Sequence, residues 1–165
     1  MNRRTFVGAL YSAGLLAGNA CAEETPAEGT HSDPWDKGSL LEPTALAAVL
    51  DGSAKRPAIV CVTFPVLYRA RHIRGAELAG PTNKPEGIAA LKQAVSQLRK
   101  NAELVVYCGC CPMVKCPNIR PAYRTLKDLG FTDVRVLNLP TNLHVDWTQK
   151  GFPVEPPLAD AVNAS

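Results

Sequence analysis

The fold is decided by the stretch Leu104-Val-Val-Tyr-Cys108-Gly-Cys110-Cys111-Pro-Met-Val-Lys-Cys116-Pro-Asn118-Ile-Arg120-Pro-Ala122. Its apolar, β-prone start, residues 104–107, predicts a short strand buried on both faces of a parallel sheet. Asn118 is a residue type that caps helices, and the pattern after it predicts a helix ending at Leu129, before Gly130. Between strand and helix lies a loop with four of the chain's six cysteines.

The order of strand, thiol, loop and helix predicts a reactive cysteine at Cys108. Loop N–H groups and a helix N-terminus both favour negative charge, so a thiol with an ordinary pKa of about 8.5 is expected to ionise more readily there. Nearby cations would lower the pKa of Cys108 further and attract a small anion. We therefore interpret Cys108 as the nucleophile, Cys110, Cys111 and Cys116 as auxiliary thiols, and Gly109, Lys115, Asn118 and Arg120 as loop and anion-binding residues.

The rest of the chain predicts alternating helices and strands. Apolar β-branched runs indicate strands near residues 58–63, 76–78 and 133–137, and helical spacing indicates helices at 42–50, 86–100 and 143–151, with Trp147 towards the core. This alternation predicts an α/β fold with a mainly parallel central sheet flanked by helices. The length of 165 residues suits one such domain.

Residues 1–22 are typical of a signal peptide. Arg3 and Arg4 precede a mildly apolar run, and Ala20-Cys-Ala22 fits a small-x-small cleavage site. The paired arginines favour twin-arginine export, with a general secretory signal as the alternative. Because the apolar run is too short to span a bilayer, we expect a periplasmic protein with no stable membrane insertion after cleavage.

The remaining segments define the expected domain boundaries. Residues 23–40 are polar and rich in Pro and Gly, which predicts a flexible linker. The domain is expected at 41–157, followed by a tail at 158–165. Removing residues 1–22 takes away Arg3 and Arg4 and no acidic residue, so the formal net charge falls from +3 to +1. A nucleic-acid partner is therefore not expected.

Four local patterns, taken in order, resemble the rhodanese-like domain, the fold of thiosulfate sulfurtransferases and related sulfur carriers. The resemblance covers about residues 41–156. Its patterns are His72-Ile-Arg-Gly-Ala76, similar to the family's H-I-P-G-A; Val105-Val-Tyr-Cys108, similar to its V-V-Y-C; Leu129-Gly-Phe131 before the strand near 134–137; and Trp147-Thr-Gln-Lys-Gly-Phe-Pro-Val154, similar to its W-x-x-x-G-x-P-V.

The resemblance implies a chemistry for Cys108. In this family the cysteine at the end of that strand takes sulfur from a donor such as thiosulfate, holds it as a persulfide among loop N–H groups, and passes it to a thiophilic acceptor. The implied partners are a small sulfur-containing anion and a thiol acceptor, and no cofactor is required.

The chain also departs from the family pattern. Cys61-Val-Thr63 stands where the family has Asp-Val-Arg, and Leu139-Pro-Thr-Asn142 replaces a common Gly-Gly. Nine residues separate Cys108 from Asn118, where the family usually has about five before its helix-leading arginine, and three of the nine are cysteines. The resemblance therefore supports the fold more directly than the activity.

The loop cysteines also allow other interpretations. A phosphatase or arsenate reductase needs cysteine, five residues and arginine, and none of the loop cysteines has an arginine at that spacing. The C-x-x-C pair Cys108 and Cys111 would suit thiol–disulfide exchange. Disulfides within the loop, with Cys61 as a small buried hydrophobe, are the purely structural alternative.

Metal binding is the remaining alternative. The cluster would bind copper, zinc or an iron–sulfur centre, because such ions prefer thiolates. Its ligands would be Cys108, Cys110, Cys111 and Cys116, with Cys61 and Met113 nearby. We expect His72 to be structural and His144 to be a surface or capping residue.

Overall fold

The computed structural model describes residues 33–155. The predicted signal peptide, the linker up to residue 32 and the predicted tail lie outside this range. Within it, no helix is both long enough and apolar enough to cross a lipid bilayer.

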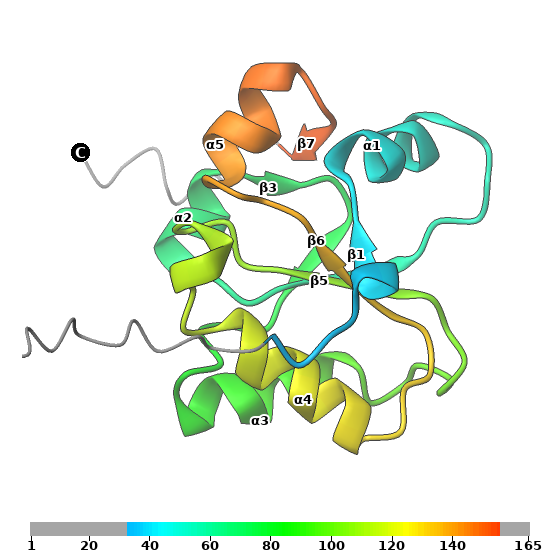
Figure 1. The fold of residues 1–165 in the computed structure, drawn as a ribbon, viewed down its shortest axis with the longest axis vertical. Helices are drawn as coiled ribbons and strands as arrows, with labels where there is room; N and C mark the ends of the chain where they lie inside the picture. Colours follow the sequence, from blue (N-terminus) through cyan, green and yellow to red (C-terminus); the bar gives the residue numbers. More distant parts are fainter. Residues whose placement is uncertain (1–32, 156–165) are drawn as a thin grey trace, which may run out of the picture. The chain divides into compact units, whose positions relative to one another are not determined.

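A five-stranded, fully parallel sheet forms the centre of the domain (Figure 1). β5 pairs on one side with β2 and on the other with β6, and all four of its side chains are fully buried. This confirms the predicted strand at 104–107 and the predicted fold class. The strand order is β1 (Leu40–Leu41), β6 (Val134–Leu137), β5 (Leu104–Tyr107), β2 (Ala58–Cys61) and β4 (Ala76–Leu78).

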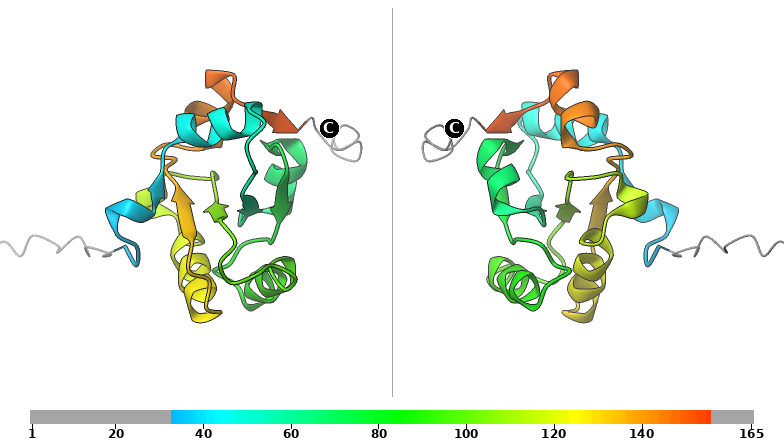
Figure 2. Two further views of the ribbon diagram at one scale, coloured as in Figure 1. Left: turned by 90° about the vertical axis from the view of Figure 1, so that its right-hand side faces the viewer. Right: turned by 90° about the vertical axis from the view of Figure 1, so that its left-hand side faces the viewer.

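Helices cover both faces of the sheet (Figures 1 and 2). One face packs against α3 (Pro85–Ala94) and α4 (Ile119–Asp128), and the other against α1 (Pro43–Asp51) and the segment that contains α5 (Leu143–Asp146). Three short 3₁₀ turns, η1 (Lys37–Ser39), η2 (Met113–Lys115) and η3 (Thr148–Lys150), lie in the connections.

The two faces have separate apolar cores, because successive side chains of a strand point to opposite sides. Val106 of β5 and Cys108 after it belong to the core under α3 and α4. Val105 and Tyr107 belong to the core under α1, together with Cys61 and the fully buried Trp147. The face on which each cysteine lies is therefore set by its position along its strand.

The domain begins earlier than the expected boundary at residue 41. Trp35 is only 8% exposed and packs edge-to-face on Tyr123 of α4, with ring centroids 5.5 Å apart. Asp36 caps η1 by accepting from the Ser39 N–H, and β1 pairs with β6. Residues 33–40 are thus part of the fold, because burial of the Trp35 indole fixes a segment that composition alone predicts to be a linker.

Some elements differ from the sequence expectations. α2 (Pro65–Ala70) lies where no helix was expected, and it begins at Pro65, a residue favoured at the first helical position. α3 ends at Ala94 instead of continuing to residue 100. The expected helix at 143–151 is divided into α5 and η3 at Trp147. β3 (His72–Ile73) pairs antiparallel with β7 (Val154–Glu155) as a separate small sheet.

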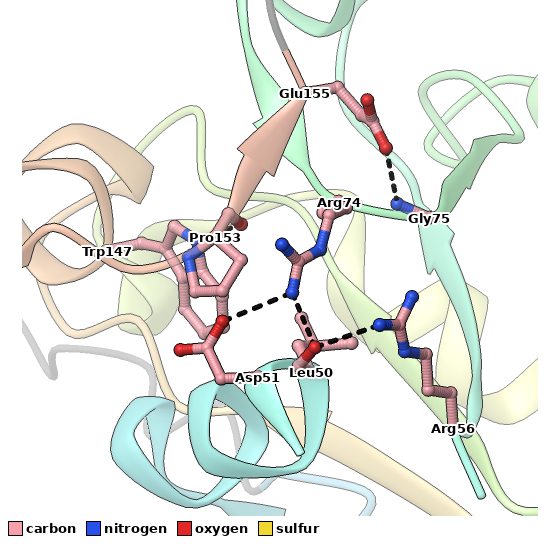
Figure 3. Close-up of polar contacts among 8 residues, drawn as sticks. All are labelled: Leu50, Asp51, Arg56, Arg74, Gly75, Trp147, Pro153 and Glu155. Atoms are coloured by element: carbon pink, nitrogen blue, oxygen red, sulfur yellow. Dashed lines mark hydrogen bonds and ion pairs between the residues drawn. The ribbon is translucent and has the colours of Figure 1, made fainter. Parts of the chain in front are cut away.

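Arg74, in the turn after β3, joins three parts of the chain (Figure 3). Its guanidinium donates to the Leu50 carbonyl and pairs with Asp51 at 3.2 Å, at the C-terminal end of α1, where a helix favours positive charge. The neighbouring Gly75 N–H donates to Glu155 at 3.2 Å. The related motif has proline at the position of Arg74, and a proline side chain could not form this ion pair with Asp51.

We expect alkaline pH to destabilise the fold through Cys61. Burial raises the pKa of the Cys61 thiol from 9.0 to about 12. Between these two pKa values the unfolded chain loses a proton that the folded chain keeps, so the free energy of unfolding falls as pH rises, by up to about 1.4 kcal/mol per pH unit. In urea unfolding between about pH 9 and pH 11, Cys61→Ala should flatten this fall; parallel profiles for the wild type and the variant would contradict the linkage.

Candidate active site in the cysteine loop

Cys108 lies directly after β5, at the C-terminal edge of the sheet, where open parallel sheets place their ligands. The chain then turns at Gly109, which has a φ of +73°. A Cβ atom at Gly109 would come within 2.8 Å of Leu143 Cβ, and the Gly109 carbonyl accepts from the Leu143 N–H at 3.0 Å. Glycine therefore lets the loop press against α5 and orients the sulfur that precedes it.

The loop gathers three sulfur atoms. Cys108 Sγ lies 3.1 Å from Cys110 Sγ, and the Sγ atoms of Cys108, Cys110 and Cys116 all lie within 4.8 Å of one another. Cys111 Sγ contacts only the edge of this group, 3.4 Å from Cys110 Sγ. All five cysteines of the described part of the chain are free thiols. The close pair is thus Cys108 and Cys110, a C-x-C pair, and not the C-x-x-C pair expected for dithiol exchange.

Negative charge in this cluster is stabilised on Cys116. The neighbouring thiols of Cys108 and Cys110, together with the backbone N–H groups of Asn118 and Ile119 at the start of α4, lower the pKa of Cys116 strongly. The amides at the helix N-terminus therefore act on Cys116, one turn of chain before α4, and not on Cys108.

The predicted lowering of the pKa of Cys108 is wrong. The hydrogen bond with the Cys110 thiol by itself lowers the pKa of Cys108, but the adjacent Cys116 and burial outweigh this and raise it to about 11. A thiol beside a thiolate keeps its proton, because losing it would place two negative charges side by side.

Asn118 stands at the N-cap position of α4, as the sequence predicts, but its side chain makes no capping hydrogen bond. Its side chain is fully buried, donates from Nδ2 to Cys108 Sγ at 3.5 Å, and accepts at Oδ1 from the Asn83 N–H at 3.1 Å. Asn118 instead links the nucleophile candidate to the loop before α3.

The two cations predicted to attract an anion lie elsewhere. Arg120 pairs with Asp33 at 2.6 Å and donates to the carbonyls of Met113 and Cys116, so its guanidinium secures the cysteine loop to the N-terminal segment. Lys115 is exposed in η2 and does not line either pocket that contains Cys108. The predicted anion attraction by these two residues is therefore not supported by their positions.

An open pocket lies over Cys108 and Cys110. Arg71 and His144, both exposed, lie on its lining together with Thr63 and Asn142. Thr63 is 4% exposed, and its hydroxyl has no hydrogen-bond partner within residues 33–155. A cation and an unpartnered hydroxyl beside a thiol are suited to a small oxyanion.

Sequence reasoning missed Arg71, Thr63 and His144 as pocket residues. Two features of the sequence point to these residues. Thr63 stands where the related motif has arginine, and Arg71 directly precedes the motif that begins at His72. His144 was expected to be a surface residue; it is exposed, and it lines this pocket.

Cys61 and Met113, the other candidate metal ligands, lie on different faces of the sheet. Cys61 is buried in the core under α1, on the opposite face of the sheet from Cys108. This agrees with the expectation of a small buried hydrophobe and not with the alternative in which Cys61 reaches the cluster. Met113 lines a small enclosed cavity next to Cys108, Cys111 and Cys116. The cysteine cluster is therefore built from the loop alone.

Comparison with known proteins identifies the fold. No protein-family model and no curated protein matches the sequence. Among solved structures, the BH2092 protein from Bacillus halodurans is 20% identical, with a TM-score of 0.58 over 74% of this chain and 80% of that one. The rhodanese-like domain of the Alr3790 protein from Anabaena sp. is 22% identical, with a TM-score of 0.54 over 77% and 85%.

A thiosulfate sulfurtransferase from Pseudomonas aeruginosa is also similar, with 25% identity and a TM-score of 0.53. This likeness covers 73% of the present chain but only 20% of that protein. The domain thus has the rhodanese-like fold that the four sequence patterns predicted.

Replacing Asn118 is expected to destabilise the site's framework. In Asn118→Ala the buried Cys108 sulfur and the Asn83 N–H both lose a hydrogen bond to the fully buried Asn118 amide, which should lower the free energy of unfolding by about 1 to 3 kcal/mol. Asn138→Ala is the matched control, because Asn138 bonds Glu42 at the surface, and should cost about 0.5 kcal/mol or less. Urea unfolding of both variants measures the difference; equal effects would show that the Asn118 contacts carry no special stability.

Proposed function

We propose that this protein is a sulfurtransferase-like protein that forms a persulfide on Cys108 and passes the sulfane sulfur to a thiophilic acceptor. The observation that carries the proposal is the position of Cys108, at the end of β5 and on the lining of an open pocket that also presents Arg71. The likeness to a thiosulfate sulfurtransferase supports the same chemistry. We further propose that this activity is periplasmic, a proposal supported by the signal-like pattern of residues 1–22.

With thiosulfate as donor, the charging step begins with ionisation of Cys108. Its thiol proton passes to solvent through the open pocket that Cys108 lines. Cys108 Sγ then bonds to the outer sulfur of the donor, the sulfur–sulfur bond of the donor breaks, and sulfite leaves with its electron pair. Because the neighbouring Cys116 and burial raise the pKa of Cys108 to about 11, we expect its ionisation to limit this step.

Transfer to the acceptor reverses this proton movement. The acceptor's thiolate bonds to the outer sulfur of the persulfide, and the electron pair of the breaking bond returns to Cys108. Cys108 then takes up a proton from solvent through the open pocket. Arg71, on the pocket lining, would stabilise the anionic donor and then the anionic persulfide.

Charging of Cys108 is tested by mass spectrometry. Reduced protein treated with thiosulfate should gain about one sulfur atom on the peptide that contains Cys108. Cys108→Ser should abolish both this gain and sulfur transfer to an added acceptor, whereas Cys111→Ser, outside the group of three sulfurs, should retain them. Sulfur transfer that persists in Cys108→Ser would overturn the proposal.

The contribution of Arg71 is tested by donor kinetics. Removing one charge-assisted contact of about 1.5 to 3 kcal/mol should raise the KM for thiosulfate about 10-fold or more in Arg71→Ala. Arg69→Ala is the matched control, because Arg69 is also exposed on α2 but does not line the pocket. Equal kinetics for the two variants would remove Arg71 from the site.

A further inference from the structure

The three gathered sulfurs have the composition of a soft-metal site. We propose that Cys108, Cys110 and Cys116 together bind one Cu(I) ion as three thiolate ligands. Soft thiolate ligands select Cu(I) over the harder ions that prefer oxygen. The inference does not depend on persulfide chemistry, because it concerns the reduced protein without a sulfur donor.

The spacing of the sulfurs fits a shared ion. Sulfurs that each lie about 2.3 Å from one metal ion are about 3.8 to 4.0 Å apart, whether the arrangement is tetrahedral or planar. In the structure the closest pair is at 3.1 Å and all three lie within 4.8 Å of one another. Changes of about 1 Å or less in the sulfur positions would therefore bring all three onto one ion.

The surroundings supply the hydrogen bonds that metal thiolates use. The Asn118 Nδ2 group donates to Cys108 Sγ, and the backbone N–H groups of Asn118 and Ile119 face Cys116 Sγ. Such outer contacts orient the ligands and offset the negative charge that three thiolates leave after binding a monovalent ion. Cys116 is held in place because α4, which begins three residues later, packs into the core through Ile119.

The ion also has a route of entry. Cys108 and Cys110 both line the open pocket, while Cys116 is 3% exposed behind them. A Cu(I) ion would meet Cys110 or Cys108 first and then Cys116, and each thiol would release its proton to solvent as it binds.

The number of ligands favours Cu(I) over Zn²⁺. Structural zinc sites are almost always four-coordinate. Within the described residues the compact group has three members, and Cys111 lies at its edge. Three thiolates suffice for Cu(I), which needs no fourth ligand.

The test is competition for Cu(I) against the chelator bicinchoninate, with reduced, metal-free full-length protein under anaerobic conditions. We expect one equivalent of Cu(I) to pass from the chelator to the protein. Cys116→Ser should weaken binding about 100-fold or more, whereas Cys111→Ser and Cys61→Ala should bind like the wild type. X-ray absorption of the complex should show three sulfur atoms about 2.3 Å from copper.

A second variant distinguishes loss of folding from loss of Cu(I) binding. If Cys116→Ser does not fold, Cys110→Ser, which removes a half-buried ligand, takes its place. Failure to take up Cu(I), an equal loss of affinity in Cys111→Ser, or tighter binding of Zn²⁺ than of Cu(I) would overturn the inference. A protein that still forms the Cys108 persulfide after such a result would leave the proposed function intact.

Discussion

The structure depends on β5, a central strand buried on both faces that ends in a thiol. Because both neighbours of β5 are parallel strands, its carboxyl end must lie at the same edge of the sheet as theirs, and the loops after them meet there. Thr63 after β2 and Asn142 after β6 reach the pocket over Cys108 for this reason. The position of the site follows from strand pairing before any loop detail is considered.

Alternation along the same strands separates two kinds of cysteine. Cys108 is one residue beyond Tyr107 and therefore points to the α4 side, where the loop and the N-terminus of α4 can meet it. Cys61 points to the other side, where burial raises the pKa of its thiol. Cys108 lines the open pocket and Cys61 is enclosed in the core under α1, so the face that a cysteine occupies decides whether a small molecule can reach it.

The sequence was sufficient for the fold and for the location of the site, but not for its electrostatics. The strands at 104–107 and 76–78 and the end of α4 before Gly130 follow from local pattern, because burial and turn residues repeat at short range. Which sulfur faces the α4 amides depends on the path of a nine-residue loop, and loop paths depend on tertiary contacts such as that between Gly109 and Leu143. Arg71 was missed for the same reason, since it reaches the pocket from the position directly after α2, a helix that the pattern did not reveal.

The two proposals for the loop rest on the same sulfur atom. Cys116 keeps a negative charge beside Cys108, and that charge would attract a soft cation. A bound Cu(I) ion would draw on an electron pair of the Cys108 sulfur and weaken it as a nucleophile, whereas a persulfide on Cys108 would move the ligand atom outward by a bond length. We therefore expect persulfide formation and copper binding to compete for Cys108.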